Sequence, residues 1–322
     1  MIDARTGSRV AVLDTGEGTT DKPNGLGGVK LVRDGAKRIV AAFAGDLYGN
    51  LWKFDLSSPT ASEWGVAFGG NPLFQAANSK GEPEPITAAP NVTRHPLGGL
   101  MVLAGSGKLF EREDSDNQSE RTLYGVWDKV KVGASSAKSD DRVTDNDLLV
   151  TQTIERLTIG DASGNYFGLS NNGVDYGAGD DAKKRGWRIR MNIALGQRLI
   201  YEPQLHSGRV IFDTMVPGGT ATGCTATEPR GYLFVLDPFT GAPGRDGPTF
   251  DTSGDGYITA ADNAAAVITS HGSIGDKAIV GVPDAGSSSQ VRVEGAGTSE
   301  LVQLGKTPIG RQWRQIATPP AY

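Results

Sequence analysis

The chain has 322 residues, of which 45 are Gly and 17 are Pro, and its formal net charge is −5. Gly is about twice as frequent as in an average soluble protein, which indicates a fold rich in turns. Acidic and basic residues are interspersed, so we expect no basic face for nucleic acid. No apolar run reaches the roughly 18 residues that a spanning helix needs, so no membrane span is expected.

The first residues, MIDARTGSRV, read as the middle of a strand and a turn. They do not combine a charged segment with the apolar segment of a secretion signal. We therefore expect one domain, residues 1–322, that forms the C-terminal part of a longer protein.

Short apolar runs bounded by Gly, Pro, Asn and Asp recur along the chain and predict β-strands. The clearest are 9–14, 38–46, 49–56, 99–107, 122–128, 186–193, 209–216 and 231–237. Run 148–159 is rich in Thr and Ile and fits a strand as well as a helix, and no long amphipathic helix stands out. The chain is therefore expected to be all-β, either a large sandwich or a propeller. At about 40–50 residues per blade, its length gives roughly seven blades.

Two segments carry a more specific pattern. Residues 45–55 read G-D-x-x-G-x-L-W-x-x-D, which predicts a hairpin with an inward aromatic side chain, and residues 230–241 partly repeat it. Within 186–193, alternation places Trp187, Ile189 and Met191 on one strand face and Arg188 and Arg190 on the other. A solvated outer face is favoured for the two arginines over a site for an anionic ligand.

Residues 251–262, DTSGDGYITAAD, have the spacing of an EF-hand-like or dockerin-like calcium loop. Calcium takes about six to eight oxygen ligands, and such a loop supplies them from positions one, three, five, seven, nine and twelve. Gly256 at position six permits the sharp turn that the loop needs. Ser253 replaces the usual Asp or Asn, and the last ligand is the shorter Asp where an EF-hand has Glu. The expected ligands are Asp251, Ser253, Asp255, the Tyr257 carbonyl, Thr259 directly or through water, and Asp262.

The other interpretation of this segment is an acidic, Gly-rich turn, because Asp-Gly pairs are common turn formers. Its flanks do not resemble a pair of EF-hand helices. Residues 263–268 are expected to form at most one or two helical turns, and 278–282 to form a strand. The loop is therefore predicted to be an insertion into a β domain, with Ile258 at position eight packed on a core.

Other candidate sites are weaker. The Gly-rich and Asn-rich acidic segment 161–181 could hold a second calcium, but a solvated loop is favoured. Cys224 is the single cysteine, so it is free or pairs outside this chain. No metalloprotease, Cys/His metal or nucleophile-elbow motif accompanies the three histidines, His95, His206 and His271, and His95 stands in a turn-like, structural context. We therefore expect no catalytic site.

A series of short motifs runs nearly from end to end of the chain. The motifs are NGL at 24–26, AFAGDLYGNLWKFDL at 42–56, PLF at 72–74, PIT at 85–87, MVLAGSGKLFE at 101–111, TLYGVWD at 122–128, DLLVTQT at 147–153, GW at 186–187, RVIFDTMVP at 209–217, Cys224 before GYLFVLDPFTG at 231–241, and RQWRQI at 311–316. One such string is unspecific, whereas the ordered series is specific. It resembles the C-terminal propeller domain of the PilC/PilY family of type IV pilus tip-associated adhesins.

The resemblance implies a modified seven-bladed β-propeller with a calcium loop, located at the pilus tip or outer surface, with the periplasm and outer membrane as its route. It implies minor pilins and the tip complex as partners, and roles in pilus assembly, in opposing retraction and in attachment.

Two alternatives to this function remain. A quinoprotein dehydrogenase propeller shares the 45–55 type of hairpin, but it needs a quinone and a calcium at the propeller axis, whereas the loop 251–262 is a local chelator. The second alternative is a scaffold propeller that binds glycans.

Overall fold

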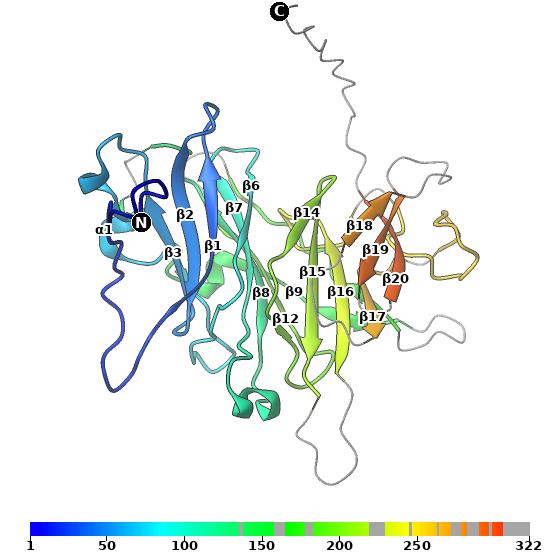
Figure 1. Ribbon diagram of the computed structural model, residues 1–322. Helices are drawn as coiled ribbons and strands as arrows, with labels where there is room; N and C mark the ends of the chain where they lie inside the picture. The colour runs from blue at the N-terminus through cyan, green and yellow to red at the C-terminus, as the bar shows by residue number, and fades with distance from the viewer. Residues whose placement is uncertain are drawn as a thin grey trace, which may run out of the picture.

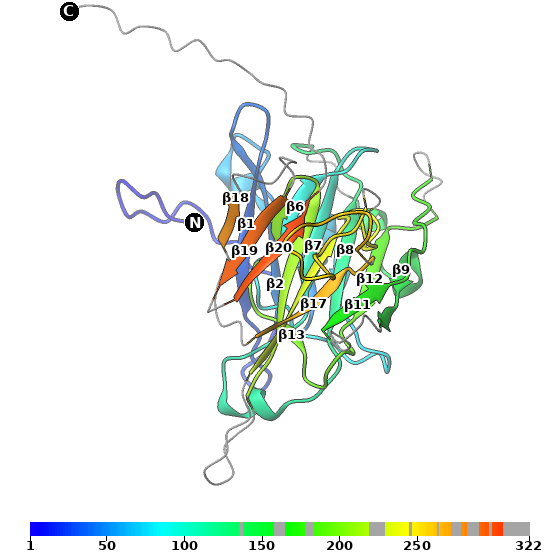
Figure 2. The ribbon, with the colours of Figure 1, turned by 90° about the vertical axis from the view of Figure 1, so that its right-hand side faces the viewer.

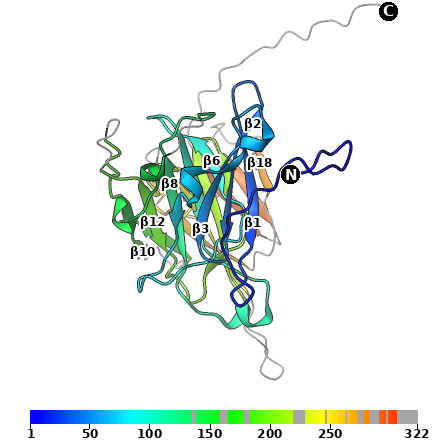
Figure 3. The same cartoon turned by 90° about the vertical axis from the view of Figure 1, so that its left-hand side faces the viewer.

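The computed structural model of the chain describes residues 1–134, 138–157, 165–177, 183–218, 229–244, 247–262, 264–271, 278–281, 290–295 and 298–304. Their strands form four sheets, which we call sheets A to D and which lie one after another across the molecule (Figure 1). Sheet A, seen from its outer side in Figure 3, contains β1 (Leu26–Arg33), β2 (Ile39–Asp46), β3 (Asn50–Asp55), β4 (Gly65–Val66) and β5 (Phe74–Gln75). Sheet B contains β6 (Asn91–Arg94), β7 (Leu100–Gly105), β8 (Thr122–Asp128), β12 (Gly186–Arg190) and β9 (Leu149–Gln152).

Sheet C is the largest. It contains β10 (Ile154–Arg156), β11 (Tyr166–Leu169), β17 (Val267–His271), β16 (Arg230–Leu236), β15 (Arg209–Val216), β13 (Arg198–Leu199) and β14 (Gln204–His206). Sheet D contains β18 (Ala278–Gly281), β19 (Gln290–Gly295) and β20 (Thr298–Gln303) and lies in front in Figure 2. All pairings between these strands are antiparallel except that of β9 with β12, and the chain passes directly from β9 in sheet B to β10 in sheet C.

The sheets are arranged as propeller blades. Strand β6, which opens sheet B, contacts both β1 of sheet A and β14 of sheet C, so strands of three successive sheets meet there. The described part of the chain holds four sheets, where chain length predicted about seven blades. The estimate was too high for this part because its connections are long, as between β16 and β17, and because sheet C takes in β10 and β11 as additional strands.

The hydrophobic core lies between the sheets. Strand β7 sends Leu100 and Val102 into the core shared with sheet A, and Met101 and Leu103 into the core shared with sheet C. Strand β16 divides in the same way, with Phe234 facing sheet B and its neighbours facing sheet D. Because successive residues of a strand point to opposite faces, a sheet packed on both sides needs an unbroken apolar run. This explains the continuous runs from which these strands were predicted.

Most of the predicted strands are confirmed, and 122–128 and 209–216 coincide with β8 and β15. Run 148–159 contains two short strands, β9 and β10. One prediction is wrong. Residues 9–14 lie outside the sheets and are mostly exposed, since their alternation finds no neighbouring strand. Residues 264–266, for which at most one or two helical turns were expected, form none, and β17 begins at Val267, where its backbone pairs with β16.

Helices are few and short among the described residues. They are η1 (Ala61–Glu63), α1 (Ala67–Gly70), η2 (Arg112–Asp116), η3 (Ser139–Asp141) and η4 (Asn146–Leu148). Over this part of the chain, no helix has the length and apolar character required to cross a bilayer.

Asp46 explains the 45–55 motif. Its carboxylate accepts hydrogen bonds from the backbone N–H groups of Tyr48 and Asn50 and from the Trp52 indole, the last at 2.7 Å. Gly49 has a φ of 78°, a conformation that favours glycine. The Asp therefore fixes both the tight turn and the inward direction of Trp52, which is 1% exposed.

A buried ion pair joins sheets A and B. Lys53 Nζ of β3 lies 2.6 Å from Asp128 Oδ2 at the end of β8, and both side chains are almost fully buried. Burial raises the pKa of the Asp128 carboxyl, and the Lys53 ammonium offsets part of that rise. The Lys53 ammonium also lies over the Phe68 ring, 5.5 Å from its centroid.

The ion pair gives a stability prediction. Lys53→Met leaves the Asp128 carboxylate buried without its cation, and we expect the free energy of unfolding in urea to fall by about 3–5 kcal/mol. The double variant Lys53→Met/Asp128→Leu should recover most of this loss, because it removes both charges from the interior. A loss below about 1 kcal/mol for the single variant would contradict this account.

Candidate calcium loop

The segment with calcium-loop spacing lies in the connection between β16 and β17 of sheet C. It is the gold loop on the right of Figure 1. Strand β16 ends in a turn in which the Asp237 carboxylate accepts the N–H groups of Phe239 and Thr240. Phe250, directly before the loop, is buried, whereas most of residues 251–262 are exposed.

The loop closes around the carboxylate of its first residue. Asp251 Oδ1 accepts the backbone N–H of Gly254 at 2.7 Å and the Ser253 hydroxyl at 3.2 Å, and Asp251 Oδ2 accepts the N–H of Gly256 at 2.8 Å. Gly254 and Gly256 have φ values of 75° and 89°, so the chain reverses where the sequence placed the loop glycine. Positions one, three and six are thereby brought together.

The last loop residue is held differently. Asp262 is buried, and its Oδ1 accepts the N–H groups of Thr252 and Ser253 while its Oδ2 accepts the N–H of Thr259 at 2.8 Å. Burial raises the pKa of Asp262, but these backbone N–H groups lower it more, so the pKa is below its ordinary value of 3.8. The carboxylate at position twelve therefore joins the two ends of the loop.

The remaining predicted ligands lie on the exposed side. Asp255 is exposed and accepts the N–H of Tyr257 at 2.9 Å, and the Thr259 hydroxyl accepts the N–H of Ala261 at 3.2 Å. The Tyr257 side chain is 64% exposed. Ile258, expected on a core, is only half-buried.

The donor set fits a hard cation in composition. Within the described ranges, no three His, Cys, Asp or Glu side chains converge so as to hold a metal ion by themselves. The predicted set contains only three carboxylates, and its other ligands are hydroxyl and carbonyl oxygens, which calcium accepts. The residues present therefore suit calcium better than zinc, which prefers Cys and His.

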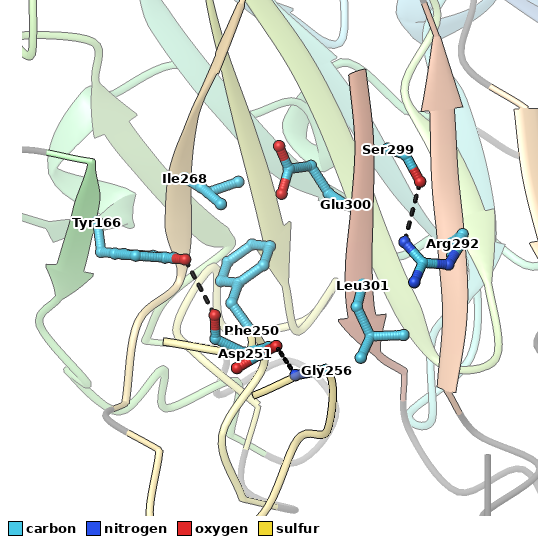
Figure 4. Close-up of a pocket in the computed structure, with 9 residues that line it drawn as sticks. All are labelled: Tyr166, Phe250, Asp251, Gly256, Ile268, Arg292, Ser299, Glu300 and Leu301. Carbon is cyan, nitrogen blue, oxygen red and sulfur yellow. Dashed lines mark hydrogen bonds between the residues drawn. The ribbon is translucent and has the colours of Figure 1, made fainter. Parts of the chain in front are cut away.

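A pocket of about 140 Å³ lies between this loop and sheets C and D (Figure 4). Tyr166 of β11 donates its hydroxyl to the Asp251 carbonyl at 3.0 Å, and Arg292 of β19 donates to the Ser299 hydroxyl at 3.0 Å. Burial raises the pKa of Tyr166, and the nearby carboxylates of Glu300, Asp251 and Asp262 raise it further. Tyr166 therefore remains a neutral hydrogen-bond donor.

Sequence reasoning missed Tyr166 and the other residues that contact the loop from outside. They lie on β11, β19 and β20, which are far from residues 251–262 along the chain, and no pattern in the sequence links them. Tyr166 and Phe167 stand inside the acidic segment that was interpreted as a solvated loop, whereas in the structure they belong to β11 and Phe167 is buried.

The other sites considered from the sequence have structural roles or lie outside the described residues. His95 is buried, stacks on Trp127 at 4.4 Å between ring centroids, and accepts the N–H of Leu97, and burial lowers its pKa to about 4. Trp187 and Ile189 are fully buried, whereas Arg188 is partly exposed and donates to Thr151, as alternation predicted. Cys224, residues 161–164 and 178–181 of the acidic segment, and the motif 311–316 lie outside the described residues.

Comparison with known proteins gives consistent matches. Residues 1–159 match the family model of the PilY1 beta-propeller domain, a match that ends before the loop. The type IV pilus biogenesis factor PilY1 of Pseudomonas aeruginosa strain PAO1 is 32% identical over 286 residues, which cover 80% of this chain and 24% of that protein. A PilY1 homolog of Xylella fastidiosa is 31% identical over 236 residues, covering 68% of this chain and 14% of that protein.

A solved structure is also similar. The crystal structure of the Pseudomonas aeruginosa PilY1 C-terminal domain matches with a TM-score of 0.77 and 28% identity, over 94% of this chain and 65% of that chain. The present chain thus spans about a quarter of the length of the Pseudomonas relative and about two thirds of its crystallised C-terminal domain.

The geometry of Asp262 predicts how acid affects the loop. A carboxyl whose pKa is lowered by folding stabilises the fold above its ordinary pKa, and this stabilisation is lost as the pH falls through the lowered value. We expect the amides of Thr252, Ser253 and Thr259 to exchange faster as the pH falls below 3.8, after correction for intrinsic exchange.

Asp262→Ala should speed the exchange of these three amides about tenfold or more at neutral pH, because a charged acceptor is lost. Asp255→Ala, the control in the same loop, should leave them nearly unchanged. Equal effects of the two variants would contradict the role of Asp262.

Proposed function

Because this chain belongs to the PilY1 family of type IV pilus biogenesis factors and matches the C-terminal β-propeller domain of that family, we propose that it is the calcium-binding propeller of a pilus tip-associated adhesin and biogenesis factor. The family is one of pilus biogenesis factors and not of enzymes, which sets aside the quinoprotein alternative. A glycan-binding role finds no specific support among the described residues.

The proposed setting is the cell surface at the pilus tip, reached through the periplasm and outer membrane. There the protein supports pilus assembly together with minor pilins and the tip complex, opposes retraction and aids attachment to a surface. This setting is supported by the similar proteins of Pseudomonas aeruginosa and Xylella fastidiosa, which are named as a type IV pilus biogenesis factor and its homolog.

The calcium part of the proposal is carried by one observation: the loop 251–262 is closed by the carboxylates of its first and twelfth residues, which accept hydrogen bonds from its own backbone. The proposed ligands are the side chains of Asp251, Ser253, Asp255, Thr259 and Asp262 and the Tyr257 carbonyl. Bound there, calcium would offset the mutual repulsion of the three carboxylates and would order the exposed side of the loop.

We propose that this ordering works as a switch. The part of the loop from Ser253 to Tyr257 is exposed, and its hydrogen bonds are made to the carboxylates of the loop itself. It is the part that the ion would fix. Ordering of a surface segment by a charge is a known type of switch. Its consequence here is that the calcium state of the tip protein sets how strongly pilus retraction is opposed.

Calcium affinity is the first test. Three carboxylates and a short closing Asp favour weak binding, so we expect a dissociation constant of roughly micromolar to submillimolar by calorimetry. Asp255→Ala should abolish binding and leave the circular dichroism spectrum unchanged, because Asp255 is exposed. Asp140→Ala, which removes an exposed carboxylate elsewhere, should bind normally. Nanomolar binding, or no binding at millimolar calcium, would contradict the proposed site.

The switch is tested in cells that carry the full-length protein. Asp255→Ala should reduce surface pili or twitching at unchanged protein level, because the loop no longer binds calcium. Asp255→Lys places a positive charge at the loop and should recover part of the phenotype. Normal piliation and twitching in both strains would leave the loop a structural element and remove the switch.

A further inference from the structure

The connection that carries the loop reaches from sheet C to sheet D. It leaves sheet C after β16 and returns to it at β17. Between them, Phe250 forms an antiparallel bridge with Val302 of β20, and the N–H of Gln303 donates to the Thr249 carbonyl at 2.8 Å. The residues directly before the loop therefore extend sheet D beyond β20, although they belong to a connection of sheet C.

The side chain of Phe250 joins the same two sheets. It is 1% exposed and packs in a hydrophobic core with Val235 and Ile268 of sheet C and with Val293 and Val302 of sheet D. An edge strand whose backbone pairs with one sheet and whose side chain fills the core between two sheets opposes their separation, because separation would expose the aromatic ring and break the pairing.

The loop itself is held from both sides. Tyr166 of sheet C donates to the carbonyl of Asp251, and Gln290 of sheet D donates its Nε2–H to the carbonyl of Ile258 at 3.2 Å. Figure 4 shows the Tyr166 hydroxyl directed at Asp251 from the side of sheet C, with β19 and β20 on the opposite side. The two acceptors stand at positions one and eight of the loop, so the shape of the loop sets the distance between the groups that hold it.

From this arrangement we infer that the loop 251–262 is a clamp between sheets C and D, and that its state is transmitted to sheet D. The loop thus acts on sheet D, the last described sheet of the same chain. Asp251 links the two roles, since its carboxylate closes the loop and its carbonyl receives Tyr166. The calcium dependence of the clamp rests on the proposed function, whereas the clamp contacts themselves do not.

The test is amide hydrogen exchange of the 322-residue chain, followed in β19 and β20 with sheet B as internal reference. The clamp variant is Tyr166→Phe/Gln290→Ala, which removes both donors and retains every predicted calcium ligand. The control is Tyr48→Phe, which removes a hydroxyl bond of 2.6 Å to the Lys22 carbonyl, far from the loop. Without calcium, the clamp variant should exchange about tenfold faster than the wild type in β19 and β20, because two hydrogen bonds are lost. Sheet B, and all sheets of the control, should be unchanged.

Measurements with calcium then distinguish the clamp between sheets C and D from the calcium site itself. At free calcium about one hundred times the dissociation constant, exchange in β19 and β20 of the wild type should slow by up to about a hundredfold, because opening of sheet D would release the ion. The clamp variant should bind calcium by calorimetry with a much smaller gain in protection. Calcium binding by the wild type with no change in β19 and β20 would overturn the transmission and leave the calcium site standing. Unchanged exchange in the clamp variant without calcium would overturn the clamp itself. Absence of calcium binding would refute the proposed function, and the calcium-free comparison would still decide the clamp.

Discussion

The structure depends on the packing of its sheets face to face. This packing buries both faces of sheets B and C. Strands β7, β8, β15 and β16 each divide their side chains between two cores. Where a large side chain lies between sheets, its neighbours must be small. An added Cβ at Gly125 or at Gly241 would lie 2.3 or 2.4 Å from the Trp187 ring, so both positions admit only glycine beside that indole. Substitution there would push the sheets apart.

Buried polar groups add specificity to this apolar packing. Glu84 lies in the connection between β5 of sheet A and β6 of sheet B and is buried. Its carboxylate accepts hydrogen bonds from the hydroxyls of Ser106, Thr122 and Tyr124. Burial raises the pKa of Glu84, and these donors partly offset the rise. Arg198 is likewise buried, and its guanidinium donates to four backbone carbonyls, which holds the connection 108–117 against β13. If such a buried group loses a hydrogen-bond partner, an unpaired polar atom remains in the interior, which is unfavourable. Each of these groups therefore favours the one arrangement of the sheets in which all its hydrogen bonds are made.

The loop between β16 and β17 combines both kinds of contact. Apolar packing holds its base through Phe250, whereas its outer part is closed mainly by backbone N–H groups bonded to Asp251 and Asp262. The first kind of contact is insensitive to charge, and the second depends on ionised carboxylates. A segment built in this way can change at its exposed side while its base stays in the core, which is what a site at a junction between two sheets requires.

The sequence by itself determined the strand class, most strand positions and the loop. Continuous apolar runs mark strands buried on two faces, and the order of Asp, Gly and hydroxyl residues at 251–262 marks a tight loop of oxygen donors, because both are local patterns of a few residues. For the described residues it overestimated the number of sheets, and it placed a strand at 9–14, since neither a division of length nor alternation reveals which segments find a partner. Only the tertiary structure decided that Thr249 and Phe250 extend sheet D and that Tyr166 and Gln290 hold the loop. Those contacts join residues distant in sequence, and they form because the two sheets bury a common core, which no local pattern encodes.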